Sequence, residues 1–331
     1  MNDDRRLQRQ IHPIREASNS FQHVHEDVER ELNRGIRLTA YAMASDGQEV
    51  VISDTCGGLV LFSLINDESQ YGAVHYIEHG ENDFILSSNC VNCMVFTKSG
   101  DRLITGHQTR GDITIRARNM HFSIVSVIRR EGNWNDLTSL AVSGLDTVLA
   151  VADKPGYVEL WDLERLTKTE TIGVGCGRFS VMSNLHFSPN GESLIVAIKC
   201  APSNSWGLIN KKDMVWYYHL VTKKEKLLEV QDIRRRCDGD FPRVFRAGFF
   251  DNHEFWVVAG SDLRQWKVSA DGIPEQGKDD QRYETCHNFA VSDDRSTVAY
   301  TGVAYTGYAD VVTVDKFMHT LDNYTDDEED L

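Results

Sequence analysis

The first residues whose types and spacing could do chemistry are two close cysteines. Cys90 and Cys93 form a lone C-x-x-C among seven scattered cysteines. A redox pair needs a helix N-terminus that lowers the thiol pKa, and a zinc site needs a second pair of ligands. This pair instead leads into an alternating segment, where residues three apart point to opposite faces of a strand. We therefore expect no metal site, and the odd count favours reduced thiols inside the cell.

Phosphate-binding and hydrolytic motifs are the next possibility. The glycine-rich run at 173–177 lacks the Lys-Ser/Thr pair that completes a phosphate loop, so it predicts a tight link between strands. The basic triple Arg234 to Arg236 is either a phosphate-binding patch or a solvated loop, because Asp232 and Asp238 flank it. No Gly-x-Ser-x-Gly elbow occurs, and no carboxylate spacing indicates a general acid–base pair. We expect a chain that is not an enzyme and needs no cofactor.

Large side chains in polar stretches point instead to binding chemistry. Trp, Tyr and Arg are enriched at binding hot spots because they offer large contact areas or fork-shaped donors. In the polar segment 200–212, Trp206 is either an anchor for a partner or a staple over its own loop. The candidate protein-binding residues are Trp206, Leu208, Ile209, Tyr305, Tyr308, Arg178, Arg243, Arg246 and Trp134.

Composition restricts the partners. The chain has 331 residues, with 50 acidic and 35 basic side chains and a net charge of −15. That balance argues against nucleic-acid binding by the bulk surface. No window approaches the roughly 18 apolar residues of a membrane span, and the first residues carry no apolar signal region. We expect partners among other protein subunits, no membrane insertion, and a location in the cytoplasm, the nucleus or both.

The elements that must position these side chains belong to an internal repeat. Each copy has an alternating apolar strand, a polar turn, a β-branched strand, a Gly/Asp turn and a third strand. The turns recur at intervals of about 42 to 61 residues, which brackets the roughly 40–45 residues of a four-stranded propeller blade. Segments 168–175 and 224–232 predict outer fourth strands. The equivalent turn positions are Gly47, Gly100, Leu145, Gly191, Asn252 and Asp294.

Two copies carry a resemblance to a known family. FSPNGESLIVA, from Phe187 to Ala197, and GYVELWDL, from Gly156 to Leu163, resemble the WD-repeat β-propeller family, with Trp161-Asp162 as the family dipeptide. The resemblance covers about Thr39 to Asp315 and implies an all-β propeller. It also implies a peptide-binding face at the loops that join second to third strands and lead into first strands. At the dipeptide position the other copies have Trp216-Tyr217, Trp266-Lys267, Phe62-Ser63 and Val314-Asp315, and the family's Gly-His signal is missing from its usual place.

The predicted organisation has three parts. Residues 1–38 form an N-terminal arm, 39–320 a β-propeller with six visible blades and seven possible, and 321–331 an acidic disordered tail. The ring either closes within this chain or accepts a strand or blade from a partner in trans. Thr325 is either an acidic-directed kinase site or part of a solubilising tail. A helix over 20–33, with a possible partner contact, is predicted from the spacing of Phe21, Val24, Val28 and Leu32.

The expected function follows from this organisation. We expect a non-catalytic scaffold or adaptor subunit of an intracellular multi-protein complex, which binds peptides or domains through the propeller loop face. One alternative is a reader of basic chromatin tails or RNA within a nuclear complex. A second is a propeller hydrolase, for which the sequence offers no catalytic triad. Four tryptophans lie in strands and are expected in the core: Trp161, Trp216, Trp256 and Trp266.

Overall fold

The structure is a computed structural model of the whole chain. It describes residues 38–46, 48–54, 58–65, 70–77, 90–107, 111–130, 136–154, 156–174, 180–200, 213–230, 245–249, 251–259, 262–269, 273–276, 281–282, 286–291, 297–302 and 309–313. The predicted N-terminal helix, the acidic tail with Thr325 and any strand that would close the ring lie outside these residues. Among the described residues, no helix is long and apolar enough to cross a membrane.

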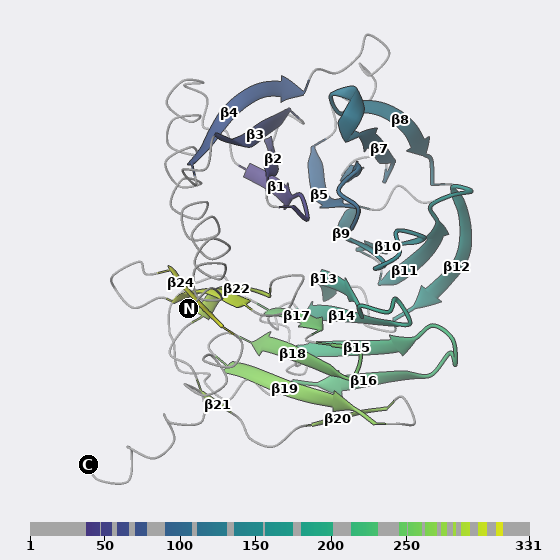
Figure 1. The fold of residues 1–331 in the computed structure, drawn as a ribbon. Helices are drawn as coiled ribbons and strands as arrows, with labels where there is room; N and C mark the ends of the chain where they lie inside the picture. Colours follow the sequence, from purple (N-terminus) through teal and green to yellow (C-terminus); the bar gives the residue numbers. More distant parts are fainter. Residues whose placement is uncertain are drawn as a thin grey trace, which may run out of the picture. The chain divides into compact units, whose positions relative to one another are not determined.

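The described strands form six antiparallel sheets, one for each predicted repeat. They group into two compact units, with the division between Met182 and Ser183. In the first unit each sheet runs in chain order, with β1, β5 and β9 side by side and β4, β8 and β12 outermost (Figure 1). Its strands are β1 (Leu38–Met43), β2 (Glu49–Asp54), β3 (Leu59–Ile65), β4 (Gln70–Ile77), β5 (Val91–Phe96), β6 (Arg102–His107), β7 (Ile113–Ala117), β8 (Ser123–Ile128), β9 (Leu137–Val142), β10 (Val148–Asp153), β11 (Tyr157–Asp162) and β12 (Thr167–Gly173).

The second unit repeats this order. One sheet has four strands, the next has four in order with β21 added at the edge of β19, and the last has three among the described residues. The strands are β13 (Ser180–Phe187), β14 (Ser193–Cys200), β15 (Met214–His219), β16 (Glu225–Glu229), β17 (Phe245–Phe249), β18 (Glu254–Ala259), β19 (Asp262–Val268), β20 (Pro274–Gln276), β21 (Gln281–Arg282), β22 (Cys286–Val291), β23 (Thr297–Gly302) and β24 (Ala309–Thr313). This is an all-β fold of the β-propeller class, as predicted, and β12 and β16 are the predicted outer strands.

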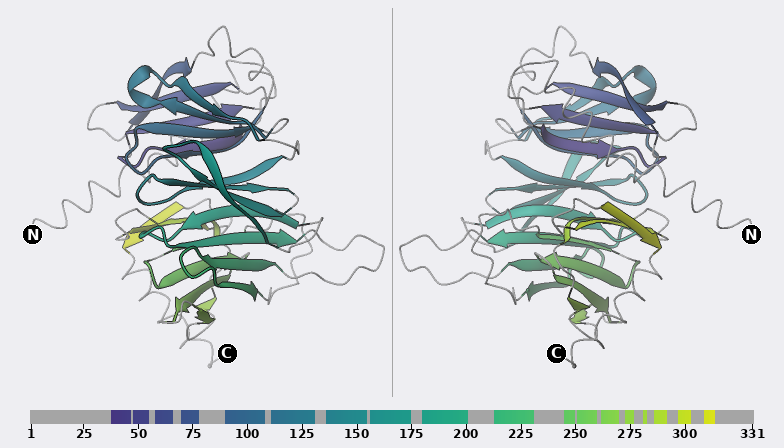
Figure 2. Two further views of the ribbon diagram at one scale, coloured as in Figure 1. Left: turned by 90° about the vertical axis from the view of Figure 1, so that its right-hand side faces the viewer. Right: turned by 90° about the vertical axis from the view of Figure 1, so that its left-hand side faces the viewer.

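Residue type explains which strands lie inside. β10 and β14 are nearly continuous runs of Val, Leu, Ile and Ala, and they are buried along almost their whole length, as expected for inner strands of packed sheets. β12, with Lys168 and Glu170, alternates only between exposed and half-buried positions. Within each unit, neighbouring sheets lie face to face (Figure 2), and the apolar faces form continuous clusters between them. The four strand tryptophans are buried as predicted, each at most 8% exposed.

In three sheets the turn between the first two strands has one residue in the left-handed region, whereas Asn252, the predicted equivalent in the β17–β18 turn, does not adopt positive φ. Gly100, Asp146 and Gly191 hold this position, with φ of 75°, 56° and 73°. Their amides donate to Thr97, Ser143 and Ser188, so the three turns are equivalent. The predicted equivalence of Leu145 was therefore wrong by one residue. Asp tolerates positive φ far better than Leu does, which explains the shift.

The side chain of Asp146 also links the β9–β12 sheet to the β5–β8 sheet through hydrogen bonds; we call this link the carboxylate clip. Its Oδ1 accepts from the Lys98 amide at 2.5 Å and its Oδ2 from the Ser99 amide at 2.8 Å, both in the turn of the preceding sheet. The second unit has a similar clip, in which the Asn190 amide donates to Asn252 Oδ1 at 2.9 Å. These contacts add polar links between consecutive repeats, whose apolar faces also pack on each other.

We expect Asp146→Ala to lower the free energy of unfolding by about 1–2 kcal/mol, because two hydrogen bonds to a carboxylate are lost. Denaturant unfolding measures this loss. Asp146→Gly removes the same bonds but relieves the positive φ, so it should cost less than Asp146→Ala. If Asp146→Gly were as stable as the unaltered chain, backbone strain rather than loss of the carboxylate clip would explain the lower stability of Asp146→Ala.

The register of the sheets corrects the predicted dipeptide positions. Trp161-Asp162 pairs with Leu149 and Val148, and Trp266-Lys267 pairs with Phe255 and Glu254. In the β13–β16 sheet the equivalent pair is Tyr218-His219, because these residues face Leu194 and Ser193; the predicted Trp216-Tyr217 lies two residues earlier. In the β5–β8 sheet the residues equivalent to Trp161-Asp162 are Arg116-Ala117. They were not identified from the sequence, because neither residue resembles the Trp-Asp pair of the family.

Candidate functional site

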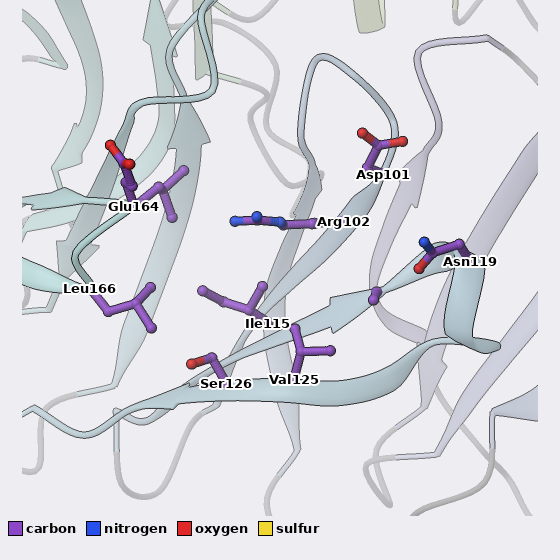
Figure 3. A pocket seen from close by; sticks show the side chains of 10 residues that line it. Asp101, Arg102, Ile115, Asn119, Val125, Ser126, Glu164 and Leu166 are labelled. Atoms are coloured by element: carbon purple, nitrogen blue, oxygen red, sulfur yellow. The ribbon is translucent and has the colours of Figure 1, made fainter.

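A groove lies between the β5–β8 and β9–β12 sheets, at their outer strands. Its volume is about 540 Å³, within the range of small-molecule sites. The β5–β8 sheet supplies one wall and the β11–β12 turn supplies the other (Figure 3). We call it the inter-sheet groove, and its lining residues are Asp101, Arg102, Ile115, Ala117, Asn119, Val125, Ser126, Leu163, Glu164 and Leu166.

Two small side chains, Ala117 and Ser123, follow Arg102 in the strand row that borders the groove. Arg102 pairs with Ala117, and Ala117 with Ser123, across β6, β7 and β8. In the β9–β12 sheet the residue at the position of Ala117 is Asp162, and in the β17–β20 sheet it is Lys267. Ala117 has only a methyl group, so the two sheets do not close on each other here.

A β-bulge shapes the floor of the groove. Arg116 pairs with Ile124 and Ile115 with Ser126, so Val125 is the extra residue in β8. In a bulge the extra residue and its neighbour are re-aimed, and here Val125 and Ser126 both line the groove. Val125 remains 47% exposed beside the buried Ile115 and Leu163. The floor is therefore apolar and partly accessible.

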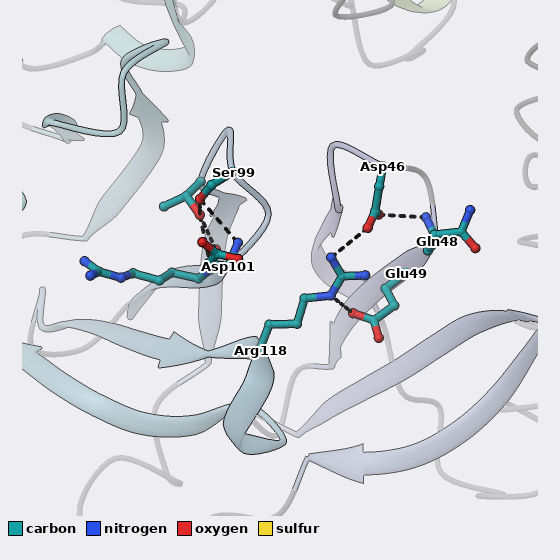
Figure 4. Close-up of polar contacts among 8 residues, drawn as sticks. Asp46, Gln48, Glu49, Ser99, Asp101 and Arg118 are labelled. Atoms are coloured by element: carbon teal, nitrogen blue, oxygen red, sulfur yellow. Dashed lines mark hydrogen bonds and ion pairs between the residues drawn. The ribbon is translucent and has the colours of Figure 1, made fainter.

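The charged groups at the groove have no partner within the described part of the chain. The guanidinium of Arg102 and the carboxylates of Asp101 and Glu164 form no ion pair there. By contrast, Arg118, which directly follows Ala117, is engaged in two ion pairs: its Nη1 lies 2.8 Å from Asp46 and its Nε 2.5 Å from Glu49 (Figure 4). Burial alone would raise the pKa of Asp46, but Arg118 and the Gln48 amide lower it below its usual value.

A second charged cluster lies deeper in the same unit. Arg130, just after β8, has its Nη2 3.0 Å from Asp153 and its Nε 2.7 Å from Glu159. Trp161 Nε1 also donates to Glu159, at 3.1 Å. Burial acts to raise the pKa of Glu159, but Arg130, Trp161 and Lys168 together lower it. A buried, permanently paired carboxylate is suited to holding strands together rather than to proton transfer.

Of the cysteine pair, Cys93 takes up an ordinary buried position in β5. Cys90 is half-buried just before this strand, and neither cysteine is in a disulfide. Burial raises the pKa of Cys93 to about 12. A thiol with that pKa is almost entirely protonated near neutral pH, so Cys93 is unsuited to nucleophilic or redox chemistry. Within the described ranges, no three His, Cys, Asp or Glu side chains are grouped as metal ligands.

The sequence-predicted binding residues are mostly outside the described residues. Only Arg246 is described; it lies half-buried in β17 opposite Val258. The others remain predictions: Trp206, Leu208, Ile209, Tyr305, Tyr308, Arg178, Arg243, Trp134 and the helix residues Phe21, Val24, Val28 and Leu32.

The inter-sheet groove lies at a different end of the strands from the predicted loop face. Asp101 belongs to the turn between the first and second strands, and Asn119 and Glu164 to turns between third and fourth strands. Sequence reasoning missed this site because its residues look ordinary one at a time. The only signal is the pair Arg116-Ala117 at the family's Trp-Asp position, and recognising it requires the strand register.

Comparison with known proteins supports the fold. No protein-family model matches the chain, and no curated protein matches it. Kuenenia stuttgartiensis hydrazine synthase is similar in structure, with a TM-score of 0.61 and 12% identity over 86% of this chain and 79% of that chain. A chain in a crystal structure of the mitotic checkpoint complex is similar with a TM-score of 0.58 and 12% identity, over 85% of this chain and 76% of that one. At such identities the similarity concerns the fold alone, and the β-propeller is that fold.

Proposed function

We propose that this chain is a non-catalytic interaction scaffold of an intracellular multi-protein assembly, a WD-repeat-like propeller that works in the cytoplasm or nucleus. The inter-sheet groove is its binding site for a segment of a partner protein. The observation that carries this proposal is the combination in one groove of an apolar floor and three charged side chains without partners in the described residues. Such a combination is what binding sites require: apolar contact area with a few polar groups that fix orientation.

Two further observations support a scaffold. The similar chain in the mitotic checkpoint complex is part of a multi-protein complex. In the described residues, burial raises the pKa of Cys93 to about 12 and Glu159 is paired with Arg130, so neither side chain is suited to nucleophilic catalysis or proton transfer. The predicted loop face, with Trp206 and Tyr305, remains a second candidate contact of the same scaffold.

We expect Ala117→Leu to abolish capture of the partner, because the larger side chain fills the groove. The tagged full-length chain is used for affinity purification from native extract, followed by mass spectrometry. Thr171→Leu is the matched control, since it adds a similar side chain to the exposed strand β12. Partner recovery should fall about 10-fold or more with Ala117→Leu and stay unchanged with Thr171→Leu.

A folding defect must be separated from lost binding. The melting temperatures of both variants should match that of the unaltered chain. Val125→Lys, at an exposed position of the same groove, tests the site without adding bulk next to the core. Equal partner recovery with all variants would place binding elsewhere, and a chain that captures no subunit would contradict the scaffold function.

A further inference from the structure

The fourth strands of the sheets differ in how their outer edges are protected. In β4, β8 and β12 one extra residue interrupts the pairing with the third strand: Val74, Val125 and Thr169. The three bulges occupy the same place in their sheets, next to the residue at the Trp161 position. A bulge twists an edge strand and hinders its pairing with another chain. In the fifth sheet, β20 has only three residues and begins with Pro274, which cannot donate a hydrogen bond.

Strand β16 is the described fourth strand without such protection. Its five residues pair with β15 in unbroken register, from Glu225 opposite Tyr218 to Glu229 opposite Met214. β16 is the last strand of its sheet, so its outer edge pairs with no described strand (Figure 1). A regular strand at the edge of a sheet is a template for the addition of another strand.

The hydrogen-bond pattern shows which backbone groups face this edge. The His219 amide donates to Lys224 O just before β16 begins. Just after β16 ends, the Val230 amide donates to Asp213 O. Along an antiparallel pair, residues that exchange hydrogen bonds alternate with residues whose N–H and C=O point away from the neighbouring strand. By this alternation the N–H and C=O of Leu227 point to the outer edge, where they have no partner in the described part of the chain.

The side chains on one face of β16 alternate between acidic and aliphatic. Glu225, Leu227 and Glu229 lie on this face and are exposed, whereas Leu228 on the other face is buried in the core. The buried Trp216 supports the exposed face, since it lies opposite Leu227 and its Nε1 donates to Glu225 at 3.1 Å. The strand itself sets the spacing of the exposed side chains, at about 6.5–6.8 Å between alternate residues.

This pattern distinguishes between two occupants of the edge. A second copy of the chain is disfavoured, because pairing two β16 strands about Leu227 places acid opposite acid in either strand direction, and like charges directly opposite are destabilising. A strand with basic side chains opposite Glu225 and Glu229 and an aliphatic one opposite Leu227 is complementary. The antiparallel direction is the more stable one per residue.

We propose that the outer edge of β16 binds an extended segment of a partner protein by antiparallel strand addition, independently of the inter-sheet groove. The segment has the alternating pattern basic–aliphatic–basic. Main-chain hydrogen bonds to groups such as those of Leu227 provide affinity, and the alternate side chains provide selectivity.

The probe is a synthetic nine-residue peptide with the central sequence Lys-Thr-Val-Thr-Lys, titrated against the purified full-length chain by fluorescence anisotropy. Leu227→Pro should raise its Kd about 10-fold or more, because proline removes an outward N–H without removing a hydrogen bond to β15. A peptide with Glu in place of both Lys residues should bind at least about 10-fold more weakly to the unaltered chain.

Thr171→Pro is the matched control. Thr171 is exposed in β12, and the same alternation, counted from the bond between Val174 N and Gly156 O, directs its N–H outward. This variant should change the Kd by less than about 2-fold, and its melting temperature should match that of Leu227→Pro.

N-methylated peptides test the binding mode without altering the protein. In antiparallel addition the amide of the central Val faces β16 and the amides of both Thr residues face away. N-methylation of Val should therefore raise the Kd about 10-fold or more, and N-methylation of either Thr should change it by less than about 2-fold.

Four results would overturn the proposal: no binding of the peptide, equal binding to Leu227→Pro, equal effects of the two N-methylations, or a dimer of the free chain that Leu227→Pro dissociates. The last result would identify a second copy as the occupant. None of them bears on the scaffold function at the inter-sheet groove, which partner capture with Ala117→Leu decides separately.

Discussion

Arg130→Met should lower the free energy of unfolding by about 3 kcal/mol, at the lower end of the range for breaking a buried ion pair. The side chains of Arg130, Asp153 and Glu159 are only 5%, 4% and 10% exposed, so the substitution leaves two carboxylates in the interior without their cation. The expected loss of stability is at the lower end of this range because Lys168, with its Nζ 3.5 Å from Glu159 Oε1, remains as a weak partner. Hydrogen exchange of the β10 and β11 amides measures the loss where it occurs.

The neighbouring residue provides the control for this prediction. Arg129 is exposed and carries the same charge, so Arg129→Met removes one positive charge without uncovering a buried carboxylate. It should change stability by less than about 0.5 kcal/mol. Equal effects of the two substitutions would show that net charge, and not the buried network, is responsible.

The same substitution has a defined pH dependence. The native pKa of Glu159 is lowered from its ordinary value of 4.5, so the unfolded chain binds a proton first as the pH falls. The stability contributed by this carboxylate is therefore complete above about pH 4.5 and is lost as the pH falls through the native pKa. The difference between the unaltered chain and Arg130→Met should be full at neutral pH and should shrink as the pH falls through the range in which Glu159 takes up a proton, which begins at higher pH in the variant because burial without Arg130 raises the pKa of Glu159. A difference that does not vary with pH would contradict the assigned role of Glu159.

Phe255→Ala should lower the free energy of unfolding by about 3–5 kcal/mol, the range for truncating a buried aromatic side chain. Phe255 is fully buried, with its ring centroid 6.3 Å from that of Tyr217, 6.1 Å from Trp266 and 5.9 Å from Phe249. Removing the ring leaves a cavity lined by three aromatic side chains, which cannot collapse into the space. Denaturant unfolding, followed by tryptophan fluorescence, measures the loss.

Leu227→Ala is the control for the core substitution. Leu227 lies in outer strand β16 and is 45% exposed, so its truncation should cost less than about 1 kcal/mol. Phe255→Leu should lie between the two, because it keeps part of the buried volume. A loss of under about 1.5 kcal/mol for Phe255→Ala would mean that the aromatic cluster repacks.

The strands were predictable because their signals are local. The alternation of Leu185 and Phe187 with His186 placed β13, and the exposed runs at 168–175 and 224–232 placed β12 and β16. The buried tryptophans followed from their strand context. Positions within turns were harder to predict: Leu145 was predicted to be equivalent to Gly100 and Gly191, but Asp146 holds that position, and only the backbone angles and hydrogen bonds distinguish the two residues.

The sequence by itself determined the class of fold, the number of repeats in the described residues and the order of strands, because period-two alternation and turn residues act over a few positions. Only the tertiary structure decided the site. Arg102 and Glu164 come from different repeats, and their meeting depends on the pairing of Arg102 with Ala117, the bulge at Val125 and the packing of one sheet on the next. These are properties of register and side-chain volume across strands, so no local pattern encodes them.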